Sequence, residues 1–139
     1  MATIHCEIVS AERELFSGIV TQIEAVGTIG GLGIRPGHAP LLTGIQPGPV
    51  KLLMEDGEEE IFFASGGFIE IQPGYVTILA DSAERAEDLD EALAKEAEEA
   101  AERARSDQAA DVDFSVVAAQ MAEAQAQLRT IDELRKMKR

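Results

Sequence analysis

Tryptophan is absent from this sequence, and aromatic residues, cysteine and basic residues are all scarce. The 139 residues include one Cys, one Tyr and five Phe, and 12 Lys and Arg stand against 26 Asp and Glu. The net charge of −14 argues against nucleic acid as a direct partner, because phosphates would be repelled. The single Cys6 excludes an internal disulfide and fits a reducing compartment. Since it alternates with Ile4 and Ile8, we interpret Cys6 as a core residue rather than a nucleophile.

The sequence also lacks the features of membrane spans, secretion signals and common active sites. No apolar run approaches the ~20 residues of a membrane helix. No basic region followed by an apolar block opens the chain, so we expect no signal peptide. His5 and His38 are the only histidines, which with one cysteine leaves no His/Cys set for a metal ion. Because no Ser/His/Asp or Cys/His arrangement is specific either, we expect no catalytic residues, no metal and no cofactor.

Glycine and proline are confined to the first part of the chain, and the last of them is Gly74. Up to Ala80, short runs with a period of two are separated by a turn signal about every 8–12 residues, as in an antiparallel sandwich or barrel. Asp56-Gly57 predicts a tight hairpin, and Pro73-Gly74 predicts a type II turn. From Asp81 onward alanine and a helical period take over. We therefore expect a β-sandwich over residues 1–83 and a helical region over residues 84–139.

Two amphipathic helices are expected in the helical region. Asp88 would cap the first, with Glu91 reaching back, and Asp113 would cap the second. The apolar stripe of the first helix would comprise Leu89, Leu93, Ala97, Ala100 and Ala104. The stripe of the second would comprise Phe114, Val117, Met121, Ala124, Leu128 and Ile131. The short polar break between them predicts an antiparallel hairpin, and the alanine-rich first stripe predicts shallow docking.

Basic residues gather at the end of this acidic chain. Residues 126–139 hold five bases and two acids. The five bases, which we call the basic tip, are Arg129, Arg135, Lys136, Lys138 and Arg139. Cations near a helix C-terminus offset its dipole by about 0.3–1 kcal/mol, but the cluster exceeds what that requires. The asymmetry between this tip and the acidic rest of the chain is the sharpest electrostatic feature of the sequence.

Residues 30–43 carry the most specific pattern in the chain. They read Gly-Gly-Leu-Gly-Ile-Arg-Pro-Gly-His-Ala-Pro-Leu-Leu-Thr, which strongly resembles the epsilon subunit of bacterial F-type ATP synthase. Further signatures of that family stand in order along the chain: Val9-Ser10-Ala11-Glu12, Phe16-Ser17-Gly18, Ser65-Gly66-Gly67, Gln72-Pro73-Gly74, Thr77-Ile78-Leu79-Ala80-Asp81, Asp88-Leu89-Asp90-Glu91-Ala92, Asp111-Val112-Asp113-Phe114 and Gln127-Leu128-Arg129. The resemblance therefore covers essentially the whole chain.

This resemblance implies a fold and a role. The fold would be a β-sandwich of about ten antiparallel strands followed by an α-helical hairpin. The role would be that of a non-catalytic rotor subunit, which binds the gamma subunit and the membrane ring of c subunits and couples proton flow to ATP synthesis. The helices would hinder ATP hydrolysis through transient contact with the catalytic beta and alpha subunits. The protein would lie peripherally at the cytoplasmic face of the bacterial inner membrane.

The resemblance also assigns residues by position. Gamma-facing residues would be Ser10, Leu41, Leu42 and Thr43, and ring-facing residues would be Thr28, Gly31, Leu32 and His38. Gly31 stands where family members commonly have a glutamate. The basic tip would be the inhibitory element, with an acidic segment of the catalytic beta subunit as its complementary target. Some family members bind ATP at an I/L-D-x-x-R-A motif, in which this chain keeps Asp90 but has Leu93 in place of the arginine, so no nucleotide site is expected.

Two other readings compete with the rotor subunit. One is a self-contained β-sandwich ligand module that dimerises through a coiled coil. The other is a sandwich-fold isomerase or similar enzyme that uses His38. The family match continues through both helices and favours the rotor subunit.

Overall fold

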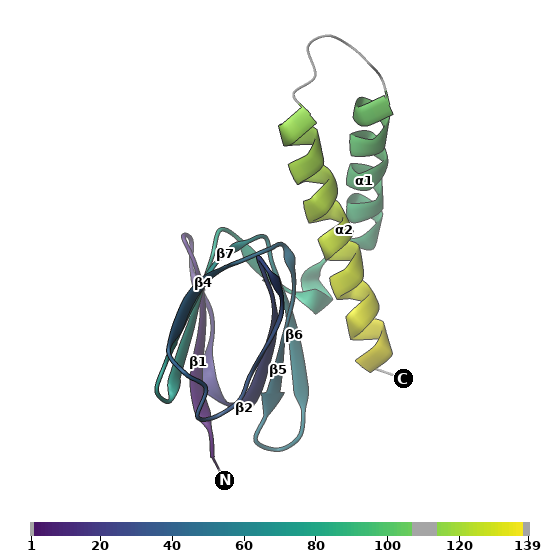
Figure 1. Cartoon of the computed structure of the whole chain (residues 1–139). Coiled ribbons are helices and arrows are strands. Elements are labelled where there is room, and N and C mark those ends of the chain that lie inside the picture. The colour runs from purple at the N-terminus through teal and green to yellow at the C-terminus, as the bar shows by residue number, and fades with distance from the viewer. Residues whose placement is uncertain (1, 107–113, 138–139) are drawn as a thin grey trace.

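The structure is a computed structural model that describes residues 2–106 and 114–137. The elements in chain order are β1 (Ile4–Ser10), β2 (Glu14–Gly27), β3 (Gly30–Ile34), β4 (Leu41–Ile45), β5 (Gly48–Met54), β6 (Glu59–Ala64), β7 (Gly67–Gln72), β8 (Tyr75–Ala80), β9 (Ala83–Arg85), the 3-10 turn η1 (Ala86–Asp88), α1 (Glu91–Ser106) and α2 (Phe114–Met137). A β-sandwich followed by a helical hairpin is therefore present, as expected (Figure 1).

The sandwich consists of two layers that share strand β2. Strands β4, β7, β8 and β1 are neighbours in one layer, and β5, β6 and β9 are neighbours in the other. The first half of β2 pairs with β1, and its second half pairs with β3 and β5. The register of β2 shifts between Val20 and Gln22, where the strand passes from one layer to the other. A strand can turn the corner of a sandwich at such an irregularity.

Two details of the sheet differ from the expectation. The part of the chain that the structure describes contains nine strands rather than about ten. Strands β1 and β8 pair in parallel rather than antiparallel, with Ile8 opposite Ile78. A long stretch of chain separates these two strands, and only such long connections permit parallel pairing.

Both predicted turns are confirmed by the backbone conformation of their glycines. Gly57 in the β5–β6 hairpin has φ +87°, and Gly74 in the β7–β8 turn has φ +73°. Both values lie in the left-handed region, which glycine enters without a steric penalty. The Met54 backbone N–H donates to the Glu58 carbonyl at 2.8 Å and closes the hairpin ladder.

Cys6 lies in the core between the two layers, as the alternation predicted. Its side chain is fully buried together with Ile4 and Ile8, and the inner side chains of β7 and β8 complete this part of the core. Burial, with a smaller contribution from the carboxylate of Glu7, raises the pKa of the Cys6 thiol to about 12. The thiol is therefore protonated at neutral pH.

Native Cys6 is expected to resist alkylation. The thiolate is the reactive form of cysteine. Because its pKa is raised, Cys6 has at pH 8 a thiolate fraction roughly a thousandfold below that of an ordinary cysteine. Iodoacetamide labelling followed by mass spectrometry should therefore give no adduct in buffer and complete modification in denaturant. Rapid labelling of the folded chain would contradict the burial of this residue.

The face that helix α1 turns to α2 overlaps the predicted stripe only in part, since Ala104 is half-buried against Val117 and Met121. Its buried residues are Ala94 and Ala101, whereas Ala97 and Ala100 are exposed and Leu93 is 62% exposed. The cap also differs: the Leu93 backbone N–H donates to the Asp90 carboxylate at 3.2 Å, so Asp90 rather than Asp88 caps α1. Alanines surround this helix on several sides, so their spacing did not single out one face.

Helix α2 packs against both α1 and the sandwich. Buried side chains of the predicted stripe are Val117, Met121, Ala124 and Ile131, and Leu128 is half-buried. Ala126 and Thr130 are also fully buried, and the Thr130 hydroxyl donates to the Ala126 carbonyl at 2.7 Å. The side chain of Phe114 and the predicted cap Asp113 lie outside the described residues. Two buried faces on one helix explain how α2 holds α1 to the sandwich.

The surface that α2 covers is the outer face of β5 and β6. Phe62 and Ala64 of β6 belong to the sandwich core, whereas Ile61 and Phe63 are buried but lie outside that core. Because side chains alternate along a strand, Ile61 and Phe63 point outward, and α2 contacts this strand. The hairpin therefore docks through α2, while α1 has no extensive contact with the sheet in the described residues (Figure 1).

Candidate partner-binding surfaces

A helix covers one outer face of the sandwich but not the other. Helix α2 lies over β5 and β6, whereas no helix of the described residues covers the layer of β4, β7, β8 and β1 (Figure 1). We call the outer surface of that layer the bare face. Three of its large apolar side chains are more than half exposed: Leu42 at 65%, Phe68 at 57% and Leu79 at 51%. Phe68 and Leu79 are cross-strand neighbours, and adjacent exposed apolar side chains make this face a candidate protein-binding surface.

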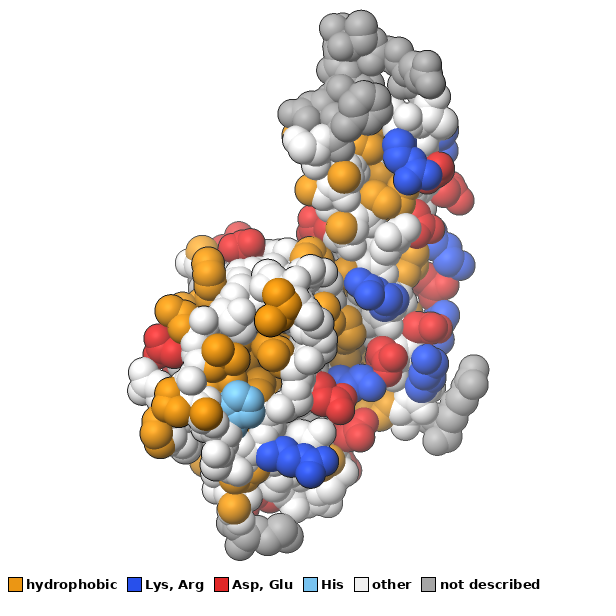
Figure 2. Space-filling model, viewed as in Figure 1, with side chains coloured by type: hydrophobic (Ala, Val, Ile, Leu, Met, Phe, Trp, Pro, Cys, Tyr) orange, Lys and Arg blue, Asp and Glu red, His pale blue; other side chains and the backbone are white. Residues whose placement is uncertain are grey.

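Strand register arranges the bare face in rows. The first row contains Gly44, Phe68, Leu79 and Val9. The second contains Leu42, Glu70, Thr77 and Glu7. The third contains Gln72, Tyr75, His5 and Ile19. An acidic row therefore separates two rows that are partly apolar, and hydrophobic and acidic side chains are interspersed on the side of the sandwich away from the hairpin (Figure 2).

The third row is held by ring contacts. The His5 and Tyr75 rings stack with their centroids 4.8 Å apart. The Ser17 hydroxyl lies 3.4 Å from His5 Nε2, and a hydrogen bond with the Glu7 carboxylate raises the pKa of Tyr75. These contacts link the acidic row to the third row, so the two present one continuous surface.

The structure does not bring together the four residues expected to face gamma. Leu42 points out from the bare face, but Leu41 and Thr43 lie opposite buried Ile71 and Ile69 and so point to the other side of β4. Ser10 ends β1, and its hydroxyl accepts hydrogen bonds from the backbone N–H groups of Glu12 and Arg13. Ser10 therefore shapes the β1–β2 turn beside the face.

Phe68 and Leu79 were missed as candidate binding residues. Their signal was present in the alternation, because each occupies an outward position of a strand whose inward residues are apolar. A large apolar side chain at an outward position of a strand indicates a partner, whereas polar side chains at such positions do not. Register then places the two side by side.

The residues expected to face the ring occupy opposite ends of β3. Thr28, Gly31 and Leu32 lie at or beside the β2–β3 turn. His38 follows the other end of β3, where its backbone N–H donates to the Arg35 carbonyl and its Nδ1 lies 2.7 Å from the Ala39 carbonyl oxygen. The four residues therefore lie at two separate places, and their assignment to the ring stays a prediction.

The β2–β3 turn presents a further apolar residue that sequence reasoning missed. Ile29 is 96% exposed at the turn, and the segment from Ala25 to Ile34 contains no charged residue. Leu32 packs over Gly27, whose added Cβ would lie 3.1 Å from Leu32 Cγ. The turn is thus an uncharged projection with an isoleucine at its end.

The basic tip is partly paired with acids in this structure. Arg135 donates to the Glu91 carboxylate of α1, and Lys136 Nζ lies 3.8 Å from Glu133. Arg129 is exposed, and Lys138 and Arg139 lie outside the described residues. Lys and Arg side chains alternate with acidic ones along the hairpin and its foot (Figure 2).

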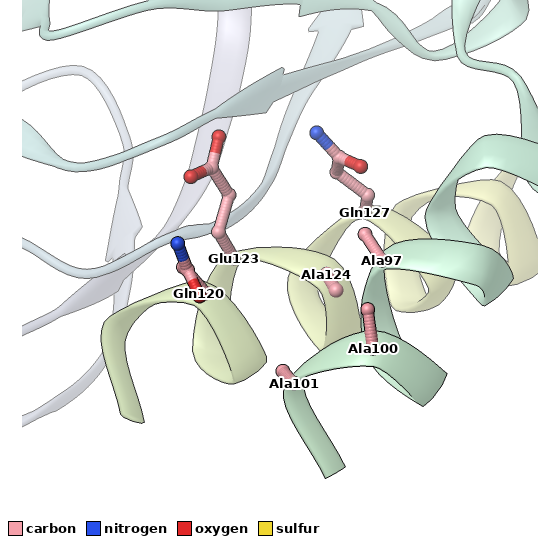
Figure 3. Close-up of a pocket in the computed structure, with 7 residues that line it drawn as sticks. All are labelled: Ala97, Ala100, Ala101, Gln120, Glu123, Ala124 and Gln127. Atoms are coloured by element: carbon pink, nitrogen blue, oxygen red, sulfur yellow. The ribbon is translucent and has the colours of Figure 1, made fainter. Parts of the chain in front are cut away.

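A groove of about 420 Å³ runs between α1 and α2 (Figure 3). Its lining residues are Ala97, Ala100, Ala101, Gln120, Glu123, Ala124 and Gln127. None of these described lining residues is basic, so they offer no cation to bind a phosphate. Asp90, which belongs to the nucleotide motif of some relatives, caps α1 instead, and the Leu93 side chain is exposed.

Within the described ranges, no group of three or more His, Cys, Asp or Glu side chains is placed to hold a metal ion. No helix in the same ranges is both long and apolar enough to cross a membrane.

Comparisons with known proteins place the chain in a family. Residues 3–86 match the family described as ATP synthase, Delta/Epsilon chain, beta-sandwich domain. The fold is similar to a chain in the structure of the Euglena gracilis mitochondrial ATP synthase OSCP/F1/c-ring, with a TM-score of 0.76 and 21% identity over 100% of this chain and 83% of that one. It is also similar to a chain of the Tetrahymena thermophila mitochondrial ATP synthase central stalk/c-ring, with a TM-score of 0.60 and 14% identity over 92% and 96% of the two chains. The matched segment contains all nine described strands and more than half of the sequence, so the chain belongs to the delta/epsilon chain family of ATP synthase.

Proposed function

We propose that this chain is the non-catalytic epsilon subunit of a bacterial F-type ATP synthase. It would join the gamma subunit to the membrane ring of c subunits in the central stalk and so couple proton flow to ATP synthesis. It would lie peripherally on the cytoplasmic face of the membrane. The helical hairpin would restrain ATP hydrolysis through transient contact with the beta and alpha subunits.

The bare face is the observation that carries this proposal. The sandwich buries one outer face under its own α2 and leaves the opposite layer open, with Phe68, Leu79 and Leu42 exposed on it. Glu7 and Glu70 lie in the row between the apolar ones. A matching partner surface therefore has apolar side chains flanked by Lys or Arg. We assign this surface to gamma, and we assign the uncharged turn at Ile29 to the ring.

A reconstitution with separately purified subunits tests the proposal. The full-length chain should co-elute with gamma at equal stoichiometry, and the complex should bind c rings in detergent. Addition to an enzyme lacking this subunit should restore proton-driven ATP synthesis. Failure to bind gamma would contradict the proposal.

The same experiment separates the two competing readings. A dimer of the isolated chain without gamma binding would support the ligand module with a coiled coil. Loss of a catalytic activity on His38→Ala would support an enzyme. The packing of α2 against both α1 and the sandwich argues against the coiled coil, because most of the predicted apolar stripe of α2 is already buried within the chain.

Reversing the charges of Arg135, Lys136, Lys138 and Arg139 is expected to raise ATP hydrolysis by at least about twofold, since the acidic partner would then be repelled. Substitution is preferable to deletion of residues 129–139, because deletion also removes buried Thr130 and Ile131. Steady-state hydrolysis by the reconstituted enzyme measures the effect, which should shrink at high salt. Reversal of Arg103 and Arg105, at the other end of the hairpin, is the matched control. Unchanged hydrolysis would assign the basic tip to helix stability alone.

A further inference from the structure

We propose that Glu7 and Glu70 determine which protein surface can cover the bare face. Their carboxylates prevent the face from pairing with a second copy of this chain, and they select a partner that places Lys or Arg opposite them. The first statement concerns the isolated chain. The second rests on the proposed function, because its partner is the gamma subunit.

The two carboxylates stand in the acidic row, on either side of Thr77 of β8. At the usual spacing of strands they are about 10 Å apart. Glu7 and Glu70 are each flanked along the strand by buried residues, so both side chains point outward. Phe68 lies two residues before Glu70 on β7, and Leu79 lies two residues after Thr77 on β8. Any surface that buries this apolar pair therefore also covers the acidic row.

Hydrogen bonds with the third row hold both carboxylates in place. Gln72 Nε2 donates to Glu70 Oε1 at 2.8 Å, and the Tyr75 hydroxyl is hydrogen-bonded to Glu7. The Tyr75 ring in turn stacks on His5. These neutral donors orient the carboxylates without neutralising them. A surface that covers the face therefore has to compensate two negative charges at fixed positions.

A second copy of the chain cannot supply those cations. None of the residues in the three rows is Lys or Arg. Residues 1–83 contain only three basic side chains, and all of them lie elsewhere: Arg13 in the β1–β2 turn, Arg35 after β3, and Lys51, whose Nζ lies 2.5 Å from Glu133 of α2. Two copies joined through their bare faces would therefore bury both acidic rows without a basic partner.

Without these carboxylates the bare face would bind its own kind. Phe68, Leu79 and Leu42 are each more than half exposed, and the outer sides of two sheet layers can pack face to face through such side chains. The acidic row keeps the free chain available for a different protein. Specificity of this kind depends on excluding the wrong partner as well as on binding the right one.

Exchanging the charges tests the first statement by sedimentation velocity of the full-length chain at pH 8. Wild type and Glu7→Lys/Glu70→Lys should each remain monomeric. An equal mixture of the two should form a 1:1 complex, with an affinity at least about tenfold above that of either chain for itself. The matched control is Glu87→Lys/Glu99→Lys, which makes the same change in net charge at exposed positions of η1 and α1. Its mixture with wild type should stay monomeric.

The apolar rows provide a second check on the mixed complex. Phe68→Ser/Leu79→Ser in the chain with wild-type charges should abolish the complex, because these side chains would form its centre. A mixture that stays monomeric, or that associates no more than the control mixture, would overturn the first statement. Wild-type dimers as tight as the mixed complex, or a complex that survives loss of the apolar pair, would also overturn it. Circular dichroism shows whether each variant is folded.

Glu7→Gln/Glu70→Gln tests the second statement, because glutamine keeps the size of both side chains and removes the charge. Its affinity for immobilised gamma should fall at least about tenfold. The affinity of the variant should also depend less on salt than that of wild type. Unchanged affinity would overturn the second statement. Absence of gamma binding by wild type would contradict the proposed function, while the sedimentation result would still decide the first statement.

Discussion

Replacing Gly67 by alanine is expected to destabilise the sandwich by about 3 kcal/mol or more. Gly67 opens β7 with φ +131°, a conformation that other residues adopt only with strain. An added Cβ would lie 2.1 Å from the Leu79 carbonyl oxygen and 3.0 Å from the Ala80 Cα. Both atoms are backbone, so no side chain can rotate away. Relief requires β7 to separate from β8, and Gly67 also pairs with Ile45 of β4.

Urea unfolding measures this effect. Gly31→Ala is the matched control, because Gly31 is exposed in β3 and an added Cβ meets no atom within 4 Å. Its stability should change by less than about 0.5 kcal/mol, as is usual for surface substitutions. A loss below about 1 kcal/mol for Gly67→Ala would show that the strands separate at this point more easily than the packing suggests.

Replacing Phe68 and Leu79 together by glutamate is expected to weaken gamma binding at least about hundredfold, as for two central interface residues. The side chains lie opposite each other on β7 and β8 and are already exposed, so the change removes no core packing. The new carboxylates would lie beside the acidic row that contains Glu7 and Glu70. Burying them against an apolar partner is unfavourable because they would lose hydration without a pairing cation.

Surface plasmon resonance with immobilised gamma gives the affinity. Leu93→Glu is the control, since Leu93 is equally exposed but belongs to α1 of the hairpin. Circular dichroism and the resistance of Cys6 to alkylation show whether the variants are folded. Binding within twofold of wild type for the Phe68→Glu/Leu79→Glu variant would remove the bare face from the gamma interface.

The turns and the buried side of most strands could be predicted from residues that lie close together in the sequence. Asp56-Gly57 and Pro73-Gly74 specify their turns because each turn needs a residue with positive φ, which glycine adopts without a steric penalty. Cys6 was identified as a core residue because alternation with Ile4 and Ile8 places all three on one side of β1. The family was identified from ordered signatures, of which the segment in residues 30–43 is the most specific.

The structure separates residues that the sequence had grouped into one candidate site, and their assignment to partners stays a prediction. Residues adjacent in sequence were assigned to one surface, but Leu41, Leu42 and Thr43 alternate between two sides of β4. His38 was grouped with Thr28 and Gly31, but β3 lies between them. Phe68 and Leu79 became a candidate site only when register placed β7 beside β8. Contacts between strands distant in the chain have no local signal.

The sequence by itself determined the two-part architecture, the turn positions, the core side of β1 and the inner stripe of α2. Each follows from spacing or from local backbone preference, which the chain carries in every context. Only the tertiary structure decided that Ala94 and Ala101 face α2, that Ile61 and Phe63 lie under a helix, and that Lys51 meets Glu133. Alanine adds too little apolar surface for its spacing to select a face. The contact between β5 and α2 joins residues far apart in the chain. It depends on how the whole hairpin packs rather than on any local pattern.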